Sequence, residues 1–446
     1  MITLNTRRWL YGATVGLVAI TMTGHMASAQ QASSSQAKQA TFNKDVMPIL
    51  QRACQNCHRP GSIAPMSLLT YKDARPWAKS IQNKVANREM PPWFIDKTIG
   101  VQKFKGDPSL SDEEIGTIVS WVAAGAPEGR PADLPPAATF DDLNKWHIGK
   151  PDLIVPLPVE WKVPVAAPDQ WPDLYTDSGL KEDRYIKSIE FKPGSSAGFR
   201  VIHHAHNYLL PPESDNDADP LNSSGEETLN EYAVGKGGDI FPAGTGRLMK
   251  AGSRIHFNLH YHAVGEEISD RGELGIVFYP KGEVPTHILH TVNMGNMQTD
   301  LDIPANGVTR TDGYYHFDSP VKIASFQPHM HDRGKRECIE AIYPSNQREM
   351  LNCATFNFGW ALIYNYAEDA APILPAGSFL HIINWHDNTA SNKGNPDPRN
   401  WVGSGNRTID EMSFAWVNYY DLSKDEYDKE VAVRRAARTK GSTQNQ

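Results

Sequence analysis

The sequence is poor in cysteine, in long apolar runs and in excess charge of either sign. Its 446 residues include four cysteines, and 44 Lys and Arg stand against 52 Asp and Glu, for a net charge of −8. A net charge this small, and negative, predicts no nucleic-acid partner. Beyond the N-terminus no run approaches the roughly 18 apolar residues of a membrane span, so we expect none in the mature chain.

The N-terminus has the pattern of a cleaved export signal over residues 1–29. Arg7 and Arg8 precede an apolar stretch that ends at Ile20, and Ala27-Ser28-Ala29 provides small residues at a cleavage site. We therefore expect a periplasmic or secreted protein. General secretory export is favoured, although the paired arginines also fit a twin-arginine signal.

Two kinds of apolar pattern divide the mature chain after a Gln/Ser/Ala-rich tether at residues 30–40. In residues 41–130 apolar side chains recur at helical spacing, and Ser111 and Glu114 form a capping box, which predicts a small all-α domain. Further on, short β-rich runs alternate with Gly, Pro, Asn and Asp clusters, which is typical of antiparallel β-sandwiches. The predicted order after the all-α domain is a Pro/Ala-rich linker at 131–150, jelly-roll-like all-β sandwich domains at 151–290 and 291–425, and a polar C-terminal tail at 426–446.

An internal repeat supports two copies of one β-unit. The segment Ala-Gly-Ser-Arg-Ile-His at 251–256 recurs as Ala-Gly-Ser-Phe-Leu-His at 376–381, an offset of 125 residues. The same offset carries His204-Ala205-His206 onto His329-Met330-His331. A fixed offset in two separated segments predicts tandem duplication. The final histidines of the two six-residue segments are expected to be structural.

Cys54, Cys57 and His58 form a Cys-X-X-Cys-His segment. In an exported protein this arrangement predicts one covalent haem c, in which both thiols add across the haem vinyl groups and the histidine takes one axial position on iron. A zinc or redox Cys-X-X-Cys site is the alternative. The candidates for the other axial position are Met66 and Met90. Met90 is favoured because two prolines follow it and stiffen its loop, so the helical domain is predicted to be a class I-like cytochrome c.

The remaining cysteines, Cys338 and Cys353, lie fifteen positions apart. In an oxidising compartment they predict a disulfide that closes one hairpin-sized loop, worth roughly 3 kcal/mol by chain-entropy reasoning. A free or metal-binding pair is the alternative.

Histidines cluster in the β-rich region in a way that favours metal binding. Because alternate residues of a strand share a face, His-X-His places two imidazoles on one side of a sheet, and imidazole suits copper and zinc. A thioether in the set would favour copper. Three groups occur after residue 200: His203-His204-Ala205-His206, His260-Tyr261-His262 and His329-Met330-His331.

Four segments carry a family resemblance: Ile202-His203-His204, Leu259-His260-Tyr261-His262, Pro328-His329-Met330-His331 and Asp410-Glu411-Met412. In this order they resemble the ligand segments of the copper type II, ascorbate-dependent monooxygenases, the family of peptidylglycine α-hydroxylating monooxygenase and dopamine β-hydroxylase. The likeness spans roughly residues 150–422. It implies two antiparallel β-sandwiches that carry one copper each and face one another across a cleft.

The resemblance also implies the ligands of two copper ions. The electron-accepting copper would be held by His203, His204 and His260, and the oxygen-activating copper would be held by His329, His331 and Met412.

Spacing alone leaves one of these assignments open. The 125-residue offset nominates His204 with His206, and adjacent His203 and His204 bind one ion only if the strand is distorted there. We expect His206 to be an outer or substitute ligand, and His262 to face the substrate or support a ligand.

Together these features predict an exported copper-dependent monooxygenase with a fused cytochrome. The cytochrome would receive electrons from an external donor, either another cytochrome or a small reductant, and pass them to the coppers. With O2, the copper centre of His329, His331 and Met412 would hydroxylate a small organic substrate. The alternative from another class is a non-catalytic electron-transfer or copper-binding protein on the same scaffold.

Overall fold

The computed structural model describes residues 39–60, 62, 64–140, 145–212, 227–233, 237–296, 301–360, 362–405 and 407–443. The predicted export signal and residues 30–38 of the tether lie outside these ranges. The chain separates by its contacts after Gln39, and the description below concerns the second unit, Ala40–Gln446. Among the described residues, no helix combines the length and the apolar character needed to cross a membrane.

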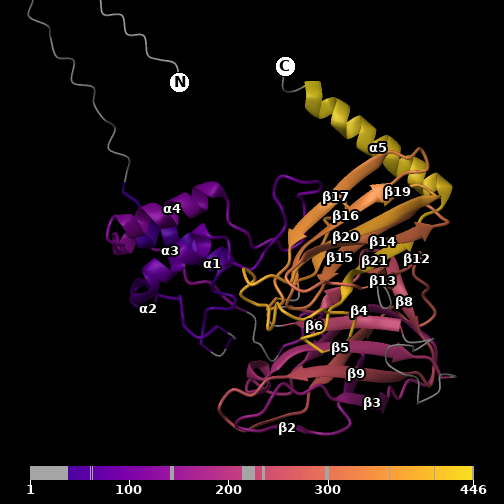
Figure 1. Ribbon diagram of the computed structural model, residues 1–446, viewed down its shortest axis with the longest axis horizontal. Coiled ribbons are helices and arrows are strands. Elements are labelled where there is room, and N and C mark those ends of the chain that lie inside the picture. The colour runs from indigo at the N-terminus through magenta and orange to yellow at the C-terminus, as the bar shows by residue number, and fades with distance from the viewer. Residues whose placement is uncertain are drawn as a thin grey trace, which may run out of the picture. The chain divides into compact units, whose positions relative to one another are not determined.

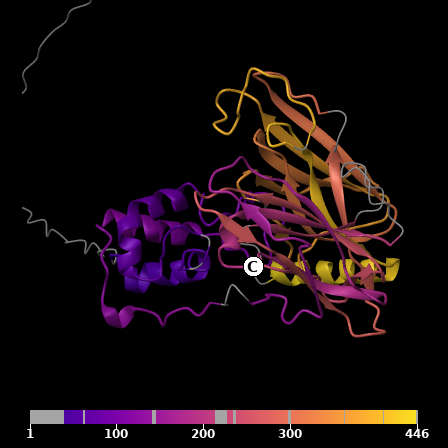
Figure 2. The same cartoon turned by 90° about the horizontal axis from the view of Figure 1, so that it is seen from below.

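The N-terminal part of the second unit is helical, in agreement with the helical spacing of its apolar residues. Figures 1 and 2 show its helices, in indigo and violet, gathered in one group. Phe42, Leu50, Ile118 and Trp121 are completely buried in their shared core. The elements are η1 (Phe42–Val46), α1 (Met47–Ala53), α2 (Tyr71–Ala74), η2 (Arg75–Trp77), α3 (Ala78–Ala86), α4 (Asp112–Ala123) and η3 (Pro131–Asp133).

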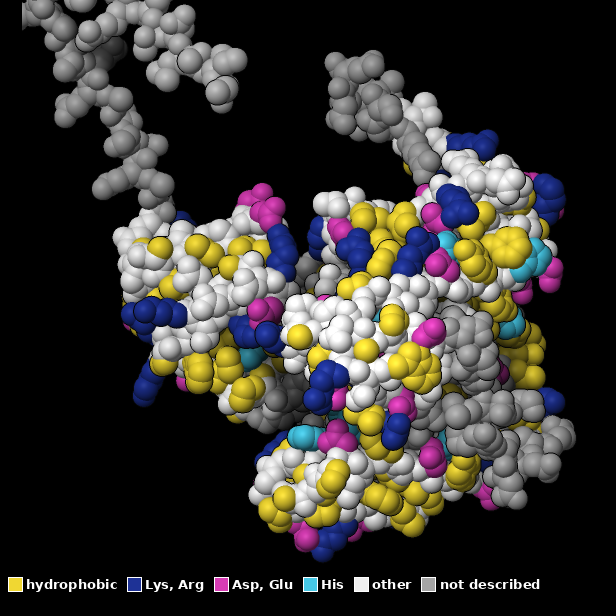
Figure 3. All heavy atoms as spheres, viewed as in Figure 1, with side chains coloured by type: hydrophobic (Ala, Val, Ile, Leu, Met, Phe, Trp, Pro, Cys, Tyr) yellow, Lys and Arg dark blue, Asp and Glu magenta, His cyan; other side chains and the backbone are white. Residues whose placement is uncertain are grey.

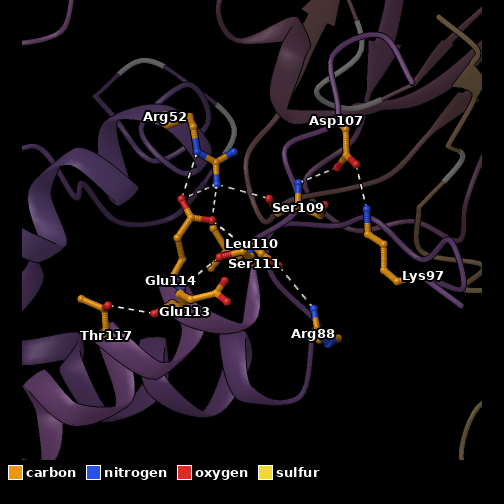
Figure 4. A network of polar contacts seen from close by, with 10 residues as sticks. All are labelled: Arg52, Arg88, Lys97, Asp107, Ser109, Leu110, Ser111, Glu113, Glu114 and Thr117. Carbon is orange, nitrogen blue, oxygen red and sulfur yellow. Dashed lines mark hydrogen bonds and ion pairs between the residues drawn. The ribbon is translucent and has the colours of Figure 1, made fainter. Parts of the chain in front are cut away.

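The start of α4 is fixed by the capping box that the sequence predicts. Ser111 accepts a hydrogen bond from the Glu114 N–H at 3.2 Å, and Glu114 accepts one from the Ser111 N–H at 2.8 Å. Arg52, next to the end of α1, pairs with the same Glu114 carboxylate at 2.7 Å (Figure 4). One side chain therefore caps α4 and ties it to the helix that leads into the Cys-X-X-Cys-His segment.

The first β-half packs two mainly antiparallel sheets around one core, as the alternating sequence predicts, and among its described strands only the short β12 pairs in parallel, with β8. Ile189 and Leu274 of one sheet meet Ala205 and Phe257 of the other, and all four are buried. Its strands are β1 (Leu153–Pro156), β2 (Trp161–Val163), β3 (Asp173–Asp177), β4 (Arg184–Lys192), β5 (Ile202–Leu210), β6 (Glu227–Ala233), β7 (Asp239–Ile240), β8 (Thr245–Met249), β9 (Arg254–Tyr261), β10 (Ile268–Asp270), β11 (Glu273–Phe278) and β12 (His287–Ile288), and η4 (Gly198–Arg200) precedes β5.

The second β-half has the same construction. Phe326 and Val417 of one sheet pack on Ile339 and Ile382 of the other. Its strands are β13 (His290–Asn296), β14 (Val308–Phe317), β15 (Val321–His329), β16 (Gly334–Ile342), β17 (Arg348–Thr355), β18 (Tyr364–Asn365), β19 (Ile373–Leu374), β20 (Ser378–Asp387) and β21 (Ser413–Asp421).

The two halves are copies of one topology. One sheet has the order β3-β9-β5-β6 in the first half and β14-β20-β16-β17 in the second, and β1-β11-β4 of the facing sheet corresponds to β13-β21-β15. Matched histidines have matched surroundings. His256 stacks on Tyr175 with ring centroids 4.4 Å apart, and His381 stacks on Tyr314 at 4.3 Å. Each also contacts the carboxylate two residues before its tyrosine, in agreement with the structural role expected of both.

The other part of the sequence repeat is not a structural equivalence. His204 and His206 lie inside β5, whose counterpart in the second half is β16. His329 ends β15, the counterpart of β4, and His331 follows in the turn. The pairing of these histidines by a 125-residue offset was therefore wrong, because loops and strands of unequal length separate the copies and no single offset holds throughout.

Residues 93–105, here called the arm, leave the helical region and pack into the second half. The Asp96 N–H donates to the carbonyl of Cys353 at 2.8 Å, and the Val101 N–H donates to that of Leu351 at 2.9 Å. Trp93 meets Tyr364 edge-on with centroids 5.0 Å apart. The arm thus lies along β17 and contributes Ile95 and Phe104 to the second-half core, although the sequence places it within the helical domain.

Three further features frame the β-halves. Cys338 and Cys353 are direct cross-strand partners on β16 and β17 and form the predicted disulfide. The predicted polar tail forms α5 (Lys424–Thr443), whose Glu430 pairs with Lys322 at 2.8 Å. At the end of the predicted linker, the His147 N–H donates to Glu190 of the first half at 2.6 Å.

Candidate metal and haem sites

Three histidines from two neighbouring strands meet in the first half. Their ligand nitrogens lie within 4.8 Å of one another, and His260 Nδ1 is 3.1 Å from His204 Nε2. His204 and His260 are direct partners across β5 and β9, whereas His203 has no partner because the register shifts between Ile202 and His204. This β-bulge is the distortion that two adjacent histidines need in order to reach one site. We call His203, His204 and His260 the three-histidine set.

Asp169 and Trp171 hold His260 in place. The carboxylate of Asp169 can only accept, so His260 Nε2 carries the proton and donates to it at 2.7 Å, which leaves the Nδ1 lone pair facing His204. Trp171 stacks on the His260 ring with centroids 3.7 Å apart and planes 11° from parallel. A carboxylate behind an imidazole is the usual support of a metal-binding histidine.

The electrostatics of the three-histidine set suit a metal. Burial lowers the pKa of His203, of His204 and of His260, the last to about 4, so the rings are neutral and carry lone pairs at physiological pH. The Nδ1 atoms of His203 and His204 are buried without a hydrogen-bond partner among the described residues. Buried unpaired nitrogens are costly, and a bound cation would satisfy them.

His262 and His206 lie beside this set. His262 is exposed, and its Nδ1 donates to the other oxygen of Asp169 at 2.7 Å, so it supports the carboxylate that supports His260. His206 is buried, and its Nε2 lies 3.7 Å from Glu231 Oε1. Neither belongs to the three-histidine set.

His329 and His331 lie close together at the end of β15, with ring centroids 5.4 Å apart. His331 Nδ1 faces the carbonyl of Asp410 at 3.1 Å, and because a carbonyl only accepts, Nδ1 carries the proton and Nε2 keeps its lone pair. The buried Glu411 accepts from the His331 N–H at 2.8 Å. Residues 410 and 411 are therefore held against His331, and half-buried Met412 follows them directly.

One tryptophan connects the two histidine groups. Trp416 of β21 lies 5.0 Å from the ring of His206 and 4.7 Å from the ring of His329. Burial lowers the pKa of His329 well below its ordinary value, and the nearby His331 and His206 lower it further. Beside Trp416 is a cavity of about 230 Å³ whose walls come from both halves. His329 itself is half-buried, and histidine side chains contribute only small cyan areas to the face drawn in Figure 3.

The Cys-X-X-Cys-His segment follows α1. Cys54 and Cys57 are free thiols, and burial raises the pKa of both, that of Cys54 to about 12. His58 Nδ1 donates to the carbonyl of Met66 at 3.3 Å, which leaves Nε2 for a metal. Two free thiols and an imidazole with this tautomer fit covalent haem attachment.

The two candidate axial methionines differ in their surroundings. Met66 packs against the helical core, as expected of a packing residue. Met90 lies in the loop between α3 and the arm, where its N–H contacts the carbonyl of Lys84 at 3.3 Å. Its side chain is half-buried, and its role as axial ligand remains a prediction.

Several residues of these sites gave no signal in the sequence. Asp169, Trp171, Glu231 and Trp416 are single residues of common types, and each becomes visible only through contacts with histidines distant in the chain. Glu411 lies inside the segment that carries the family resemblance, so its position pointed to the site even though its role did not.

Comparison with known proteins assigns no family. No family model and no curated protein matches the chain. Among solved structures it is similar to an alpha-L-fucosidase from Bacteroides ovatus, with 8% identity over 65% of this chain and 41% of that one and a TM-score of 0.17. It is also similar to the CBM22 tandem domain of Paenibacillus barcinonensis Xyn10C, with 12% identity over 56% of this chain and 83% of that one and a TM-score of 0.16. The chain spans less than half of the fucosidase, and likenesses this weak assign no activity.

Proposed function

We propose that this chain is an exported copper monooxygenase that takes its electrons through a fused c-type haem. The observation that carries the proposal is the three-histidine set, in which Asp169 leaves His260 Nδ1 unprotonated and two further Nδ1 atoms are buried without partners. An all-imidazole set of neutral rings is a ligand environment typical of copper.

The residues around the two candidate copper sites have distinct tasks. Asp169 orients His260, while the carbonyl of Asp410 fixes the tautomer of His331. Copper bound by His329, His331 and Met412 would supply the redox chemistry that activates O2 for attack on a C–H bond. Glu411 fixes the backbone there by accepting the N–H groups of His331 and Arg333.

Electrons from an external donor would enter through the haem of Cys54, Cys57 and His58. The arm supports this role, because it runs from the Met90 loop directly into the core of the second half. A donor fixed to its acceptor in this way acts at high effective concentration.

The cavity between the halves offers a place for a small polar substrate. Its walls include Arg247, Gln327 and Trp416, and with a volume of about 230 Å³ it suits a small organic molecule rather than a polymer. Its edge at Trp416 adjoins His329, one of the ligands proposed for the oxygen-activating copper.

Metal analysis and labelled oxygen test the proposal. We expect one haem and about two copper ions per chain, and label from ¹⁸O₂ in an organic product. A chain that saturates with zinc alone would contradict the copper assignment. Copper without labelled product would support the alternative, a non-catalytic copper-binding or electron-transfer protein. In the double variant Cys54→Ala, Cys57→Ala, copper should still bind but lose its reduction through the haem.

A further inference from the structure

A second group of possible ligands adjoins the three-histidine set. His204 and His206 share one face of β5, and Glu231 is the direct partner of His206 across β6. Each of the three places a ligand atom within 4.8 Å of those of the other two. His206 and Glu231 are both buried, with 7% and 8% of their surface exposed. We call these three residues the inner set.

We propose that the inner set is a separate metal site for a divalent first-row ion. Two histidines and one carboxylate form a ligand set found in non-haem iron and zinc enzymes, and it differs from the all-imidazole set beside it in charge and donor type. A carboxylate buried next to imidazoles is costly unless a cation or strong hydrogen bonds compensate it. Because His204 belongs to both sets and a neutral imidazole has one lone pair, the inner set binds its ion as an alternative to the three-histidine set and not alongside it.

Residues of the second half cover the inner set and orient its ligands. Gln327 Nε2 donates to Glu231 Oε2, and this bond orients the carboxylate so that Oε1 is directed toward His206. Trp416 packs on the His206 ring at 5.0 Å. Contacts of this kind fix the orientation of metal ligands, so the inner set depends on both halves.

The inner set also opens on the cavity between the halves. His206 and Glu231 form part of its wall, beside Asn230, Gln327 and Trp416. Three protein ligands leave at least one coordination position of a first-row ion free. Water or a substrate with an oxygen donor would occupy that position from the cavity side.

The two sets share His204, which gives the proposal a distinctive genetic pattern. Removal of His203 or His260 affects only the three-histidine set, and removal of His206 or Glu231 affects only the inner set. Removal of His204 affects both. Independent sites without a shared residue, or one site served by all five residues, would give a different pattern.

Equilibrium dialysis of the haem-loaded chain against Co²⁺, with metal counted by elemental analysis, tests this pattern. We expect the double variant His203→Ala, His260→Ala to retain a first-half cobalt ion that is lost when Glu231→Gln is added. Loss of a ligand should raise the dissociation constant for cobalt by more than about 100-fold, because removal of a residue that only supports a ligand already weakens metal binding about 10- to 100-fold. Glu227→Gln, four residues earlier on the same strand, is the matched control and should leave cobalt binding unchanged.

Two results would overturn the proposal. One is that the double variant binds no first-half cobalt while its thermal unfolding midpoint shows that it is folded. The other is that Glu231→Gln and Glu227→Gln bind cobalt equally well. If Glu231→Gln fails to fold, His206→Gln gives the same test from the other ligand. Failure here leaves the copper content and the labelled product unchanged, so it is distinguishable from failure of the proposed function.

Discussion

The two β-halves share one strand order but place their candidate ligands on different strands. The first half uses the start of β5 and the end of β9, whereas the second uses the end of β15 and the residues before β21. Their supports differ as well, with the half-exposed carboxylate of Asp169 in the first half and the completely buried Glu411 in the second. Duplication has therefore preserved the scaffold and not the sites.

The largest expected effect is selective loss of one metal. His260→Ala should remove the copper of the three-histidine set, and His331→Ala should remove only the copper of the second half. Either change should abolish turnover, because one ion alone cannot hold both electrons. Elemental analysis with electron paramagnetic resonance checks the count. Loss of both ions from either variant would show that the sites are not independent.

Glu411→Ala should destabilise the second half without a counterpart in the first. The side chain is completely buried and accepts N–H groups of His331 and Arg333 at 2.8 and 2.6 Å. Its removal leaves two buried donors unpaired, at a cost of about 2 to 5 kcal/mol in the free energy of unfolding. Denaturant unfolding measures this cost, with exposed Glu368→Ala as the control.

Asp270 should make the first half less stable as the pH rises from about 4 to about 6. Burial raises its pKa from 3.8 to about 6, so in this range the folded state binds the proton more tightly than the unfolded state. The favourable contribution is fully present below 3.8 and is lost as the pH rises through the folded pKa. Up to about 3 kcal/mol is at stake. Unfolding curves of Asp270→Asn across this range should show a flatter pH profile than the wild type.

Asp169→Asn should weaken metal binding in the first half by about 10- to 100-fold and leave the second half unchanged. The amide can still accept a hydrogen bond from His260 Nε2 but carries no charge to strengthen it. Titration with copper measures both affinities. Asp173→Asn is the matched control, because Asp173 supports the structural His256 instead. Equal effects of the two changes would contradict the role given to Asp169.

His262→Ala should have the smallest effect, a change in first-half copper affinity of less than about threefold. The ring is exposed and donates a hydrogen bond to Asp169 Oδ1, the carboxylate oxygen that does not contact His260. Its hydrogen bond is worth about 1 kcal/mol or less at such a site. The same copper titration checks this prediction, and a loss as large as that of Asp169→Asn would make His262 part of the site.

The sequence predicts elements and duplication well because both depend on local patterns. The capping box at Ser111 and the repeated segment ending at His256 are readable from neighbouring residues alone. Contacts between distant segments are not. Asp169 supports a histidine 91 positions away, and nothing in its own surroundings distinguishes it from other loop aspartates. The bulge at His203 was a requirement of the predicted ligand set, but only the strand register shows that it exists.

The packing of the arm in the second half could not be predicted from the sequence, for a different reason. Trp93, Ile95 and Phe104 are apolar residues between two helices, and such residues normally fill the core of their own domain. Which core they join depends on the available sheet edge, here that of β17, and the chain offers no local sign of it.

The arm also gives the helical region a second connection to the sheets. The chain passes between them after α4, through residues 131–150, but the arm bonds the same helical region to β17 before α4 begins. A protease that cuts within residues 134–140 would leave two fragments held together by strand pairing and by the burial of Ile95 and Phe104. Such a nicked protein should keep the size of the intact chain until it is denatured, because the two fragments stay associated.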